Sequence, residues 1–208
     1  MPKKVVQKII SRGLQNILTQ RLNAEFNGYD TDPVQWQGDT ALVFTPTQTT
    51  TEMPSGNDPA WDVIKGPVLG DVELTLYDIP VENMEDLLAV KYSEADGVCV
   101  GDSDDGTVWL GLSSDRLIKS AAGESKNKLI LYKVRFDLPA IDSKTISKDD
   151  NAIAELKLKG YAYPVFFAKA DGSTGRRTYA IVNSVKNKAK YDANTEKIVF
   201  PAEATSGS

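Results

Sequence analysis

The 208-residue chain contains no histidine and a single cysteine, Cys99. Without an imidazole it lacks the side chain most often used as a general base, nucleophile activator or metal ligand. One cysteine excludes an intrachain disulfide and a thiolate zinc cluster, and the apolar neighbours Val98 and Val100 indicate that Cys99 is a small packed residue. These absences exclude most hydrolase and metalloenzyme arrangements, so we expect a protein that is not an enzyme.

Long apolar runs are also missing. No segment approaches the ~20 consecutive apolar residues of a membrane helix, and the N-terminal residues lack the apolar core of a secretion signal. With 41% hydrophobic and 25% charged residues, the composition is that of an ordinary soluble globular protein. We therefore expect a cytoplasmic protein with one domain over residues 1–200, a flexible tail over residues 201–208, no membrane partner and no cofactor.

The net charge of −5 hides a strong segregation of charge along the chain. Residues 71–115 hold twelve acidic residues and one basic residue, Lys91, for a net charge of −11, whereas the remaining residues carry +6. The short basic clusters near the N-terminus and around Lys188 are more typical of solvated faces than of nucleic-acid contacts. Separated acidic and basic regions suit head-to-tail association, in which unlike patches of identical subunits meet.

The pattern of apolar residues predicts a mostly β fold with a helix on one flank. Residues 71–77 alternate strictly and predict a half-buried strand with Val72, Leu74 and Leu76 on its apolar face. Residues 79–90 predict an α-helix, because Asp78 can cap it and Pro80 suits its first turn. Further strands are expected near residues 40–44, 107–113, 128–138, 152–168 (broken near Pro164), 176–183 and 197–200. An arm over residues 1–12 leads into a segment whose periodicity slightly favours a helix but also allows a strand at residues 14–22.

Residues 45–66 predict a long extended loop, because they are rich in threonine and proline. Loops of more than ~15 residues are uncommon in compact domains unless they are functional or disordered. This one also carries apolar residues that a solvated linker does not need. We therefore predict a self-assembly loop that uses Phe44, Met53, Trp61 and Ile64.

Three aspartates, Asp102, Asp104 and Asp105, precede Gly106. They do not fit the usual calcium loop, which needs ligands at positions 1, 3 and 5, glycine at position 6 and glutamate at position 12. Counted from Asp102, the glycine falls one position early and position 12 is Ser113. We therefore predict a hairpin turn joining strands at residues 97–100 and 107–112, with the aspartates as its acidic tip.

A second glycine-bearing motif, Gly172-Ser173-Thr174-Gly175, also predicts a hairpin turn. It lacks the spacing and the lysine of a phosphate-binding loop, and it precedes a strand where that loop precedes a helix. No pair of carboxylates is placed by the sequence across a cleft, so no catalytic or metal site is predicted.

The order of these segments resembles the major tail protein family, the tail tube proteins of bacteriophages with long non-contractile tails. The resemblance covers about residues 66–162, with a weaker match at residues 12–18. It rests on a glycine-led strand, a proline-led helix ending in Asp-Leu-Leu, and a later Leu-Tyr strand, carried here by Gly70 to Leu76, Pro80 to Leu88 and Leu129 to Val134. The hairpin within residues 171–191 departs from the family pattern, which leaves its role open.

The resemblance implies a tail-tube-type β-sandwich or half-barrel with a flanking helix, and a strand at residues 14–22. It also implies a structural virion protein that forms hexameric rings, stacked into a tube through which DNA passes into the host without specific binding. The implied partners are further copies of the chain, a tape measure protein and other tail proteins. The implied location is the phage tail, after assembly in the bacterial cytoplasm.

Two alternatives from other classes stay open at this point. One is a tail terminator or head-tail joining protein, which would form a ring that does not propagate. The other is a small enzyme or ligand- or metal-binding β domain, which only the Asp102 to Gly106 stretch of the sequence supports.

Overall fold

A computed structural model describes residues 10–30, 32–36, 39–55, 58–77, 81–102, 106–120, 123–139 and 155–201. Within these residues, eight strands form one antiparallel sheet in the order β2-β1-β7-β8-β9-β4-β3, and β12 also pairs with β8. The strands are β1 (Ile10–Arg21), β2 (Val34–Trp36), β3 (Asp39–Ser55), β4 (Asp58–Tyr77), β7 (Leu110–Ser120), β8 (Gly123–Phe136), β9 (Glu155–Ala162) and β12 (Tyr179–Asn183). The mostly β fold predicted from the sequence is confirmed.

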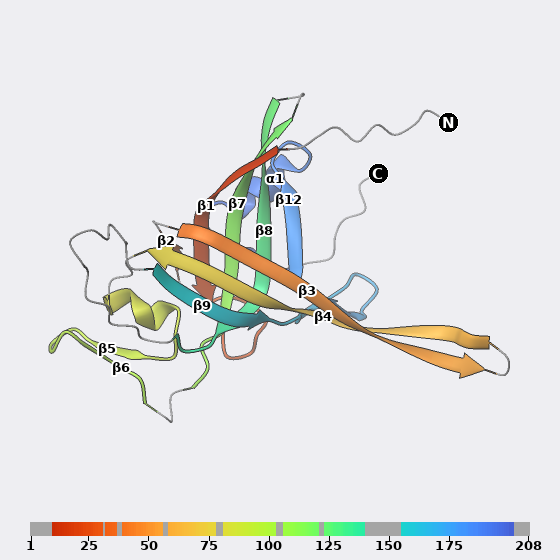
Figure 1. The fold of residues 1–208 in the computed structure, drawn as a ribbon, viewed down its shortest axis with the longest axis horizontal. Coiled ribbons are helices and arrows are strands. Elements are labelled where there is room, and N and C mark those ends of the chain that lie inside the picture. The colour runs from red at the N-terminus through yellow and green to blue at the C-terminus, as the bar shows by residue number, and fades with distance from the viewer. Residues whose placement is uncertain are drawn as a thin grey trace, which may run out of the picture.

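The sheet folds back at β8, because the two ends of this long strand pair with different neighbours. β12 pairs with the first part of this strand, through Leu129 and its neighbours, and β9 pairs with the last part, Val134 to Phe136. As a result β9, β4 and β3 cross the layer formed by β1, β7, β8 and β12 (Figure 1). One continuous sheet thereby supplies both layers of a sandwich.

The main core lies between these two layers. Its fully buried residues come from both of them, and the alternation predicted for residues 71–77 places the apolar face of β4 inside. The central members are Ile17, Val72, Leu74, Leu76, Leu110, Leu112, Leu131 and Leu158.

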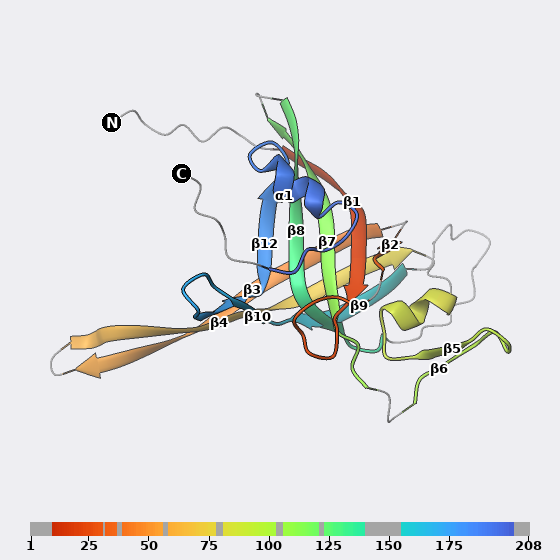
Figure 2. The ribbon, with the colours of Figure 1, turned by 180° about the vertical axis from the view of Figure 1, so that it is seen from behind.

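A second cluster covers the opposite face of β8 and β12. Helix α1 (Lys188–Ala193) and the residues after it lie against this face (Figure 2). Tyr191 and Ile198 pack there on Ile130, Tyr132 and Val182. The sequence predicted a strand at residues 197–200, and this is wrong. Ile198 lies in an irregular segment, where its buried N–H donates to Gln20 Oε1 at 3.2 Å.

The N-terminal segment is a strand, as the resemblance implied, and not the helix that the periodicity slightly favoured. Two register shifts interrupt its pairing with β7, and Asn16, which lies within the second shift, has a φ of +53°. Ile17 joins the core between the layers, whereas Leu22 joins the cluster under α1. Because both faces are covered, the apolar residues do not alternate as they do in a half-buried strand. Residues 1–9 of the expected arm lie outside the described residues.

The α-helix predicted over residues 79–90 is replaced by a short 3-10 helix, η1 (Val81–Asp86). Leu87 and Leu88 follow it and are buried in the main core, as their apolar pattern required. In an α-helix that continued to residue 90, the Glu85 carbonyl would accept a hydrogen bond from the N–H of Ala89. Here that carbonyl accepts from the Arg21 guanidinium, which also pairs with Asp86 at 3.8 Å, so the turn is not continued. Residues 78–80 are outside the described residues.

The turn at Gly172 is confirmed. It joins β10 (Val165–Ala168) to β11 (Thr174–Arg177) as an antiparallel hairpin, and Gly172 has a φ of +80°. The break near Pro164 is also observed, because β9 ends at Ala162 and β10 starts at Val165.

Candidate assembly surface

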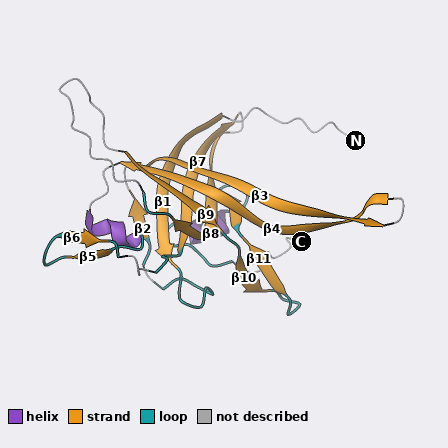
Figure 3. Cartoon of the chain, turned by 60° about the horizontal axis from the view of Figure 1, so that its bottom comes forward, coloured by secondary structure: helices purple, strands orange, loops and turns teal. Residues whose placement is uncertain are grey.

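The most unusual element is a long β-hairpin made by β3 and β4, which we call the arm where it leaves the body, at residues 45–69. The two strands pair from Asp39–Leu76 out to Ser55–Asp58, whereas β9 pairs with β4 only from Gly70 to Tyr77. Beyond Gly70, no other strand of the described residues pairs with the hairpin, and it projects far from the sandwich (Figures 1 and 3). An isolated two-stranded ribbon is marginally stable in water, so such an arm is expected to gain a partner surface.

The arm replaces the predicted loop over residues 45–66, and the prediction of irregular structure there is wrong. Among the described strands β3 is the edge of the sheet, and Pro46 and Pro54 are tolerated there because one side of an edge strand makes no ladder hydrogen bonds. The threonines that made the stretch look like low-complexity loop are β-branched, and they suit an extended strand.

A bulge at the base of the arm sets its register. Gln48 pairs with Val68 and Thr50 pairs with Lys65, so β4 holds one extra residue, at Gly66 and Pro67. A Cβ on Gly66 would lie 2.3 Å from the Thr49 hydroxyl oxygen, and the Gln48 side-chain amide donates to the Gly66 carbonyl at 2.8 Å. This local packing fixes how the arm leaves the body.

Alternation through this bulge assigns each arm residue to one of two faces. The inner face continues the core-facing row of β3 and β4 and ends in Thr50, Glu52, Val63 and Lys65. The outer face carries residues 43, 45, 47, 51 and 53 of β3, and residues 64, 69, 71 and 73 of β4. Four large apolar residues share this outer face, three on the arm and Val43 just inside the body, and each is well exposed: Val43 (49%), Met53 (45%), Ile64 (53%) and Leu69 (38%).

We call these four residues the outer stripe. Exposed threonines at positions 45, 47 and 51 lie between them, so the face is uncharged along most of β3. Single exposed apolar residues are ordinary on protein surfaces, but an aligned set on a projecting ribbon marks a surface that binds another protein. The outer stripe is therefore the candidate assembly surface.

The structure distributes the four predicted loop residues differently. Met53 and Ile64 belong to the outer stripe. Phe44 lies on the opposite face, where its ring packs against Tyr179 at 5.3 Å between centroids and against the main core. Trp61 lies within β4, and its side chain is outside the described part of the chain. Val43 and Leu69 were missed, because only the register shows that they share a face with Met53 and Ile64.

The predicted hairpin between residues 97–100 and 107–112 is wrong. β6 (Val98–Val100) pairs with β5 (Lys91–Ser93), and β7 pairs with β1 and β8 instead. The turn that closes the β5–β6 hairpin is the earlier Asp96-Gly97, with Gly97 at a φ of +64° and its N–H donating to the Ser93 carbonyl at 2.8 Å. Asp96-Gly97 and Asp105-Gly106 both predict a hairpin turn. Only the pairing of β7 with β1 and β8 shows that the hairpin forms at the first of them.

The predicted acidic tip is therefore a connection between two sheets. Asp102 is exposed, and its carboxylate lies 3.6 Å from the Lys91 ammonium, also at the surface. Asp104 and Asp105 lie outside the described residues. Within the part of the chain that is described, no group of three or more His, Cys, Asp or Glu side chains is placed to hold a metal ion. In the same part, no helix is both long and apolar enough to cross a membrane.

Comparison with known proteins adds little. No family model and no curated protein matches the sequence. Among solved structures, one match is a chain in the cryo-EM structure of the anti-feeding prophage (AFP) baseplate, 6-fold symmetrised. It has 9% sequence identity and a TM-score of 0.34, and the match covers 88% of this chain and 97% of that chain. A likeness at this level establishes neither a shared family nor a shared function.

Proposed function

We propose that this chain is a structural virion protein, the tail tube subunit of a bacteriophage, which self-assembles into stacked hexameric rings that conduct DNA. The observation that carries the proposal is the arm, a ribbon with an exposed outer stripe that, among the described residues, pairs with no third strand beyond Gly70. The form of the assembly, a tube of stacked hexameric rings, is proposed because the order of sequence segments resembles that of the major tail protein family.

In this proposal the arm of one subunit lies on a neighbouring subunit, in the same ring or in the next. The outer stripe supplies apolar area that becomes buried on contact, at about 25 cal/mol per Å². Segregated charge supplies orientation, because the acidic region of one copy meets a less acidic region of the next. A repeated head-to-tail contact of this kind closes into a ring or continues into a filament.

Removal of the arm tests the proposal. Residues 49–67 are replaced by Asn-Gly, which joins the paired residues Gln48 and Val68 through a two-residue hairpin turn. Because the core residues of β3 and β4 are retained, we expect a folded subunit with a cooperative thermal transition that no longer forms tubes in negative-stain electron microscopy.

Full-length protein is the reference in this experiment. Tubes from the full-length chain and none from the arm deletion support the proposal. Rings that never stack would favour the terminator or head-tail joining alternative. A full-length chain that stays monomeric at every salt and protein concentration, or an arm deletion that still polymerises normally, would overturn it.

A further inference from the structure

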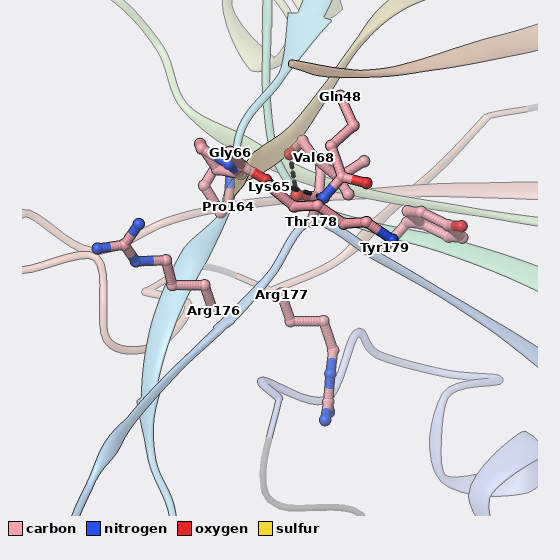
Figure 4. A pocket seen from close by; sticks show the side chains of 10 residues that line it. Gln48, Lys65, Gly66, Val68, Pro164, Arg176, Arg177, Thr178 and Tyr179 are labelled. Atoms are coloured by element: carbon pink, nitrogen blue, oxygen red, sulfur yellow. Dashed lines mark hydrogen bonds between the residues drawn. The ribbon is translucent and has the colours of Figure 1, made fainter. Parts of the chain in front are cut away.

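A notch lies at the base of the arm, between the arm's inner face and the β10–β11 hairpin (Figure 4). It has a volume of about 370 Å³ and is lined by backbone and side chains of the bulge, of Pro164 and of the segment from Arg176 to Tyr179. The Thr178 hydroxyl donates to the Val68 carbonyl, which ties the start of β12 to the arm. The notch is therefore formed by three connected elements and keeps its shape only if the arm keeps its direction.

Two cationic side chains at the notch, Lys65 and Arg176, are available to a partner. Both are exposed, and neither forms an ion pair with a carboxylate within the described residues. Arg176 lies over the Phe166 ring at 5.4 Å. Arg177 points away from Arg176 (Figure 4) and is already engaged by the Tyr132 hydroxyl and the Phe167 ring. The lining also offers apolar surface from Pro67, Val68, Pro164 and Tyr179.

The matching element is the β5–β6 hairpin. Its turn exposes two carboxylates, Glu94 and Asp96, and the Asp96 carboxylate accepts a hydrogen bond from Ser93 Oγ at 2.9 Å. Just behind the turn Val98 and Val100 are exposed, at 47% and 45%. The hairpin thus combines two carboxylates with two valines, which complements the cations and apolar lining of the notch.

The hairpin cannot reach the notch of its own subunit. In both views the β5–β6 hairpin and the arm leave the body in opposite directions (Figures 1 and 2). We propose that the β5–β6 hairpin of one copy binds the arm-base notch of a second copy, with Glu94 and Asp96 against Lys65 and Arg176. This contact rests on the proposed self-assembly, and its two surfaces would orient one copy relative to the next.

The contact is heterologous, since it joins two different surfaces, and so it can repeat without limit or close by rotation. It places acidic residues of the −11 segment on cations of the basic remainder of the chain. It also places the partner beneath the arm, so the arm's outer stripe stays free for another neighbour.

Charge exchange tests the contact. Three variants of the full chain are compared with wild type at 0.1 M salt: Glu94→Lys with Asp96→Lys, Lys65→Glu with Arg176→Glu, and all four substitutions together. The critical concentration for assembly is measured by light scattering. We expect each double reversal to raise it at least about tenfold, because like charges then face each other, and the fourfold variant to return to within about threefold of wild type.

A matched control reverses two exposed lysines elsewhere, Lys186→Glu with Lys197→Glu, and changes net charge as much as the notch reversal does. It is expected to assemble within about threefold of wild type, as substitution away from the contact predicts. A fourfold variant that assembles no better than the double reversals, or double reversals that assemble like wild type, would overturn the hairpin–notch contact.

The outcomes separate this contact from the proposed function. If wild-type protein forms tubes and the charge-reversal variants form them equally well, the hairpin–notch contact is wrong and the proposed tail tube function stands. If wild type forms other charge-sensitive oligomers, the contact stands and the tube is wrong. Wild-type protein that never associates would overturn both.

Discussion

At the scale of single residues, the least expected feature is an ion pair buried between the sheet and helix α1, next to Tyr191. Lys128 Nζ lies 2.6 Å from Asp115 Oδ1, and both side chains are almost completely buried, at 0% and 2% exposure. The other carboxylate oxygen accepts from Asn16 Nδ2 at 3.1 Å. Tyr191 lies over the lysine with its ring centre 5.2 Å from Nζ. Burial, and then the Asp115 carboxylate, raises the pKa of Tyr191.

We predict that Lys128→Met is strongly destabilising, by about 3 to 5 kcal/mol, because it leaves the Asp115 carboxylate buried without its counter-charge. Adding Asp115→Leu should recover much of that loss, since apolar side chains replace both charges. Urea unfolding followed by circular dichroism measures both effects.

The exposed pair between Lys119 and Glu124 on the same two strands is the matched control. Lys119→Met should cost less than about 1 kcal/mol, as surface pairs contribute little. Equal losses of unfolding free energy in the Lys128 and Lys119 variants would show that the buried pair contributes no more to stability than the surface pair.

At the scale of elements, what could be predicted depended on whether the pattern was local. The alternation of residues 71–77 showed both the strand and its buried face, because one face meets the core and the other meets solvent. The β1 segment did not, since its bulges and its two covered faces remove the alternation. The arm was mistaken for a loop because its prolines and threonines are local signals of irregular structure, whereas its two strands are recognised only by their pairing with each other.

The candidate surface was predictable only in part for the same reason. Apolar residues in a polar stretch led to the prediction of a binding role for Met53 and Ile64, and the structure shows that both are exposed on one face of the arm. Which residues share a face with them depends on the extra residue at Gly66 and Pro67. A Gly-Pro pair is typical of a bulge, but the sequence does not show which residue of the other strand lies opposite it.

We predict that Ile64→Asn raises the critical concentration for assembly about tenfold, because its side chain becomes buried in the contact made by the outer stripe. Met53→Asn should act in the same direction. Both substitutions are neutral, so they leave the charge of the neighbouring notch unchanged. Sedimentation velocity over a concentration series gives the measurement.

Val63 supplies the control, because it is adjacent to Ile64, also β-branched and 43% exposed, but lies on the inner face of the arm and outside the lining of the notch. Val63→Asn should change assembly by less than about threefold, about 0.6 kcal/mol. If Val63→Asn and Ile64→Asn impair assembly equally, the arm lacks a preferred binding face and the outer stripe is wrongly assigned.

At the scale of the whole molecule, acidic charge is concentrated in one part of the chain, and the arm and the β5–β6 hairpin point in opposite directions. Charges on separate surfaces act between copies over a Debye length of ~10 Å at 0.1 M salt. Assembly driven only by the outer stripe would be nearly indifferent to salt, whereas assembly oriented by charge weakens as salt rises.

Replacing Asp102, Asp104 and Asp105 with asparagine tests the role of this acidic stretch, as it changes the net charge from −5 to −2. We expect the subunit to remain folded, because Asp102 is exposed and its pair with Lys91 is a surface pair that contributes little. Light scattering between about 0.05 and 0.5 M salt, over which the Debye length falls from ~14 Å to ~4 Å, should show a weaker salt dependence of assembly than in wild type. An unchanged salt dependence would mean that these aspartates only connect β6 to β7, and that the remaining acidic residues of the segment, Glu94 and Asp96 among them, supply the orienting charge.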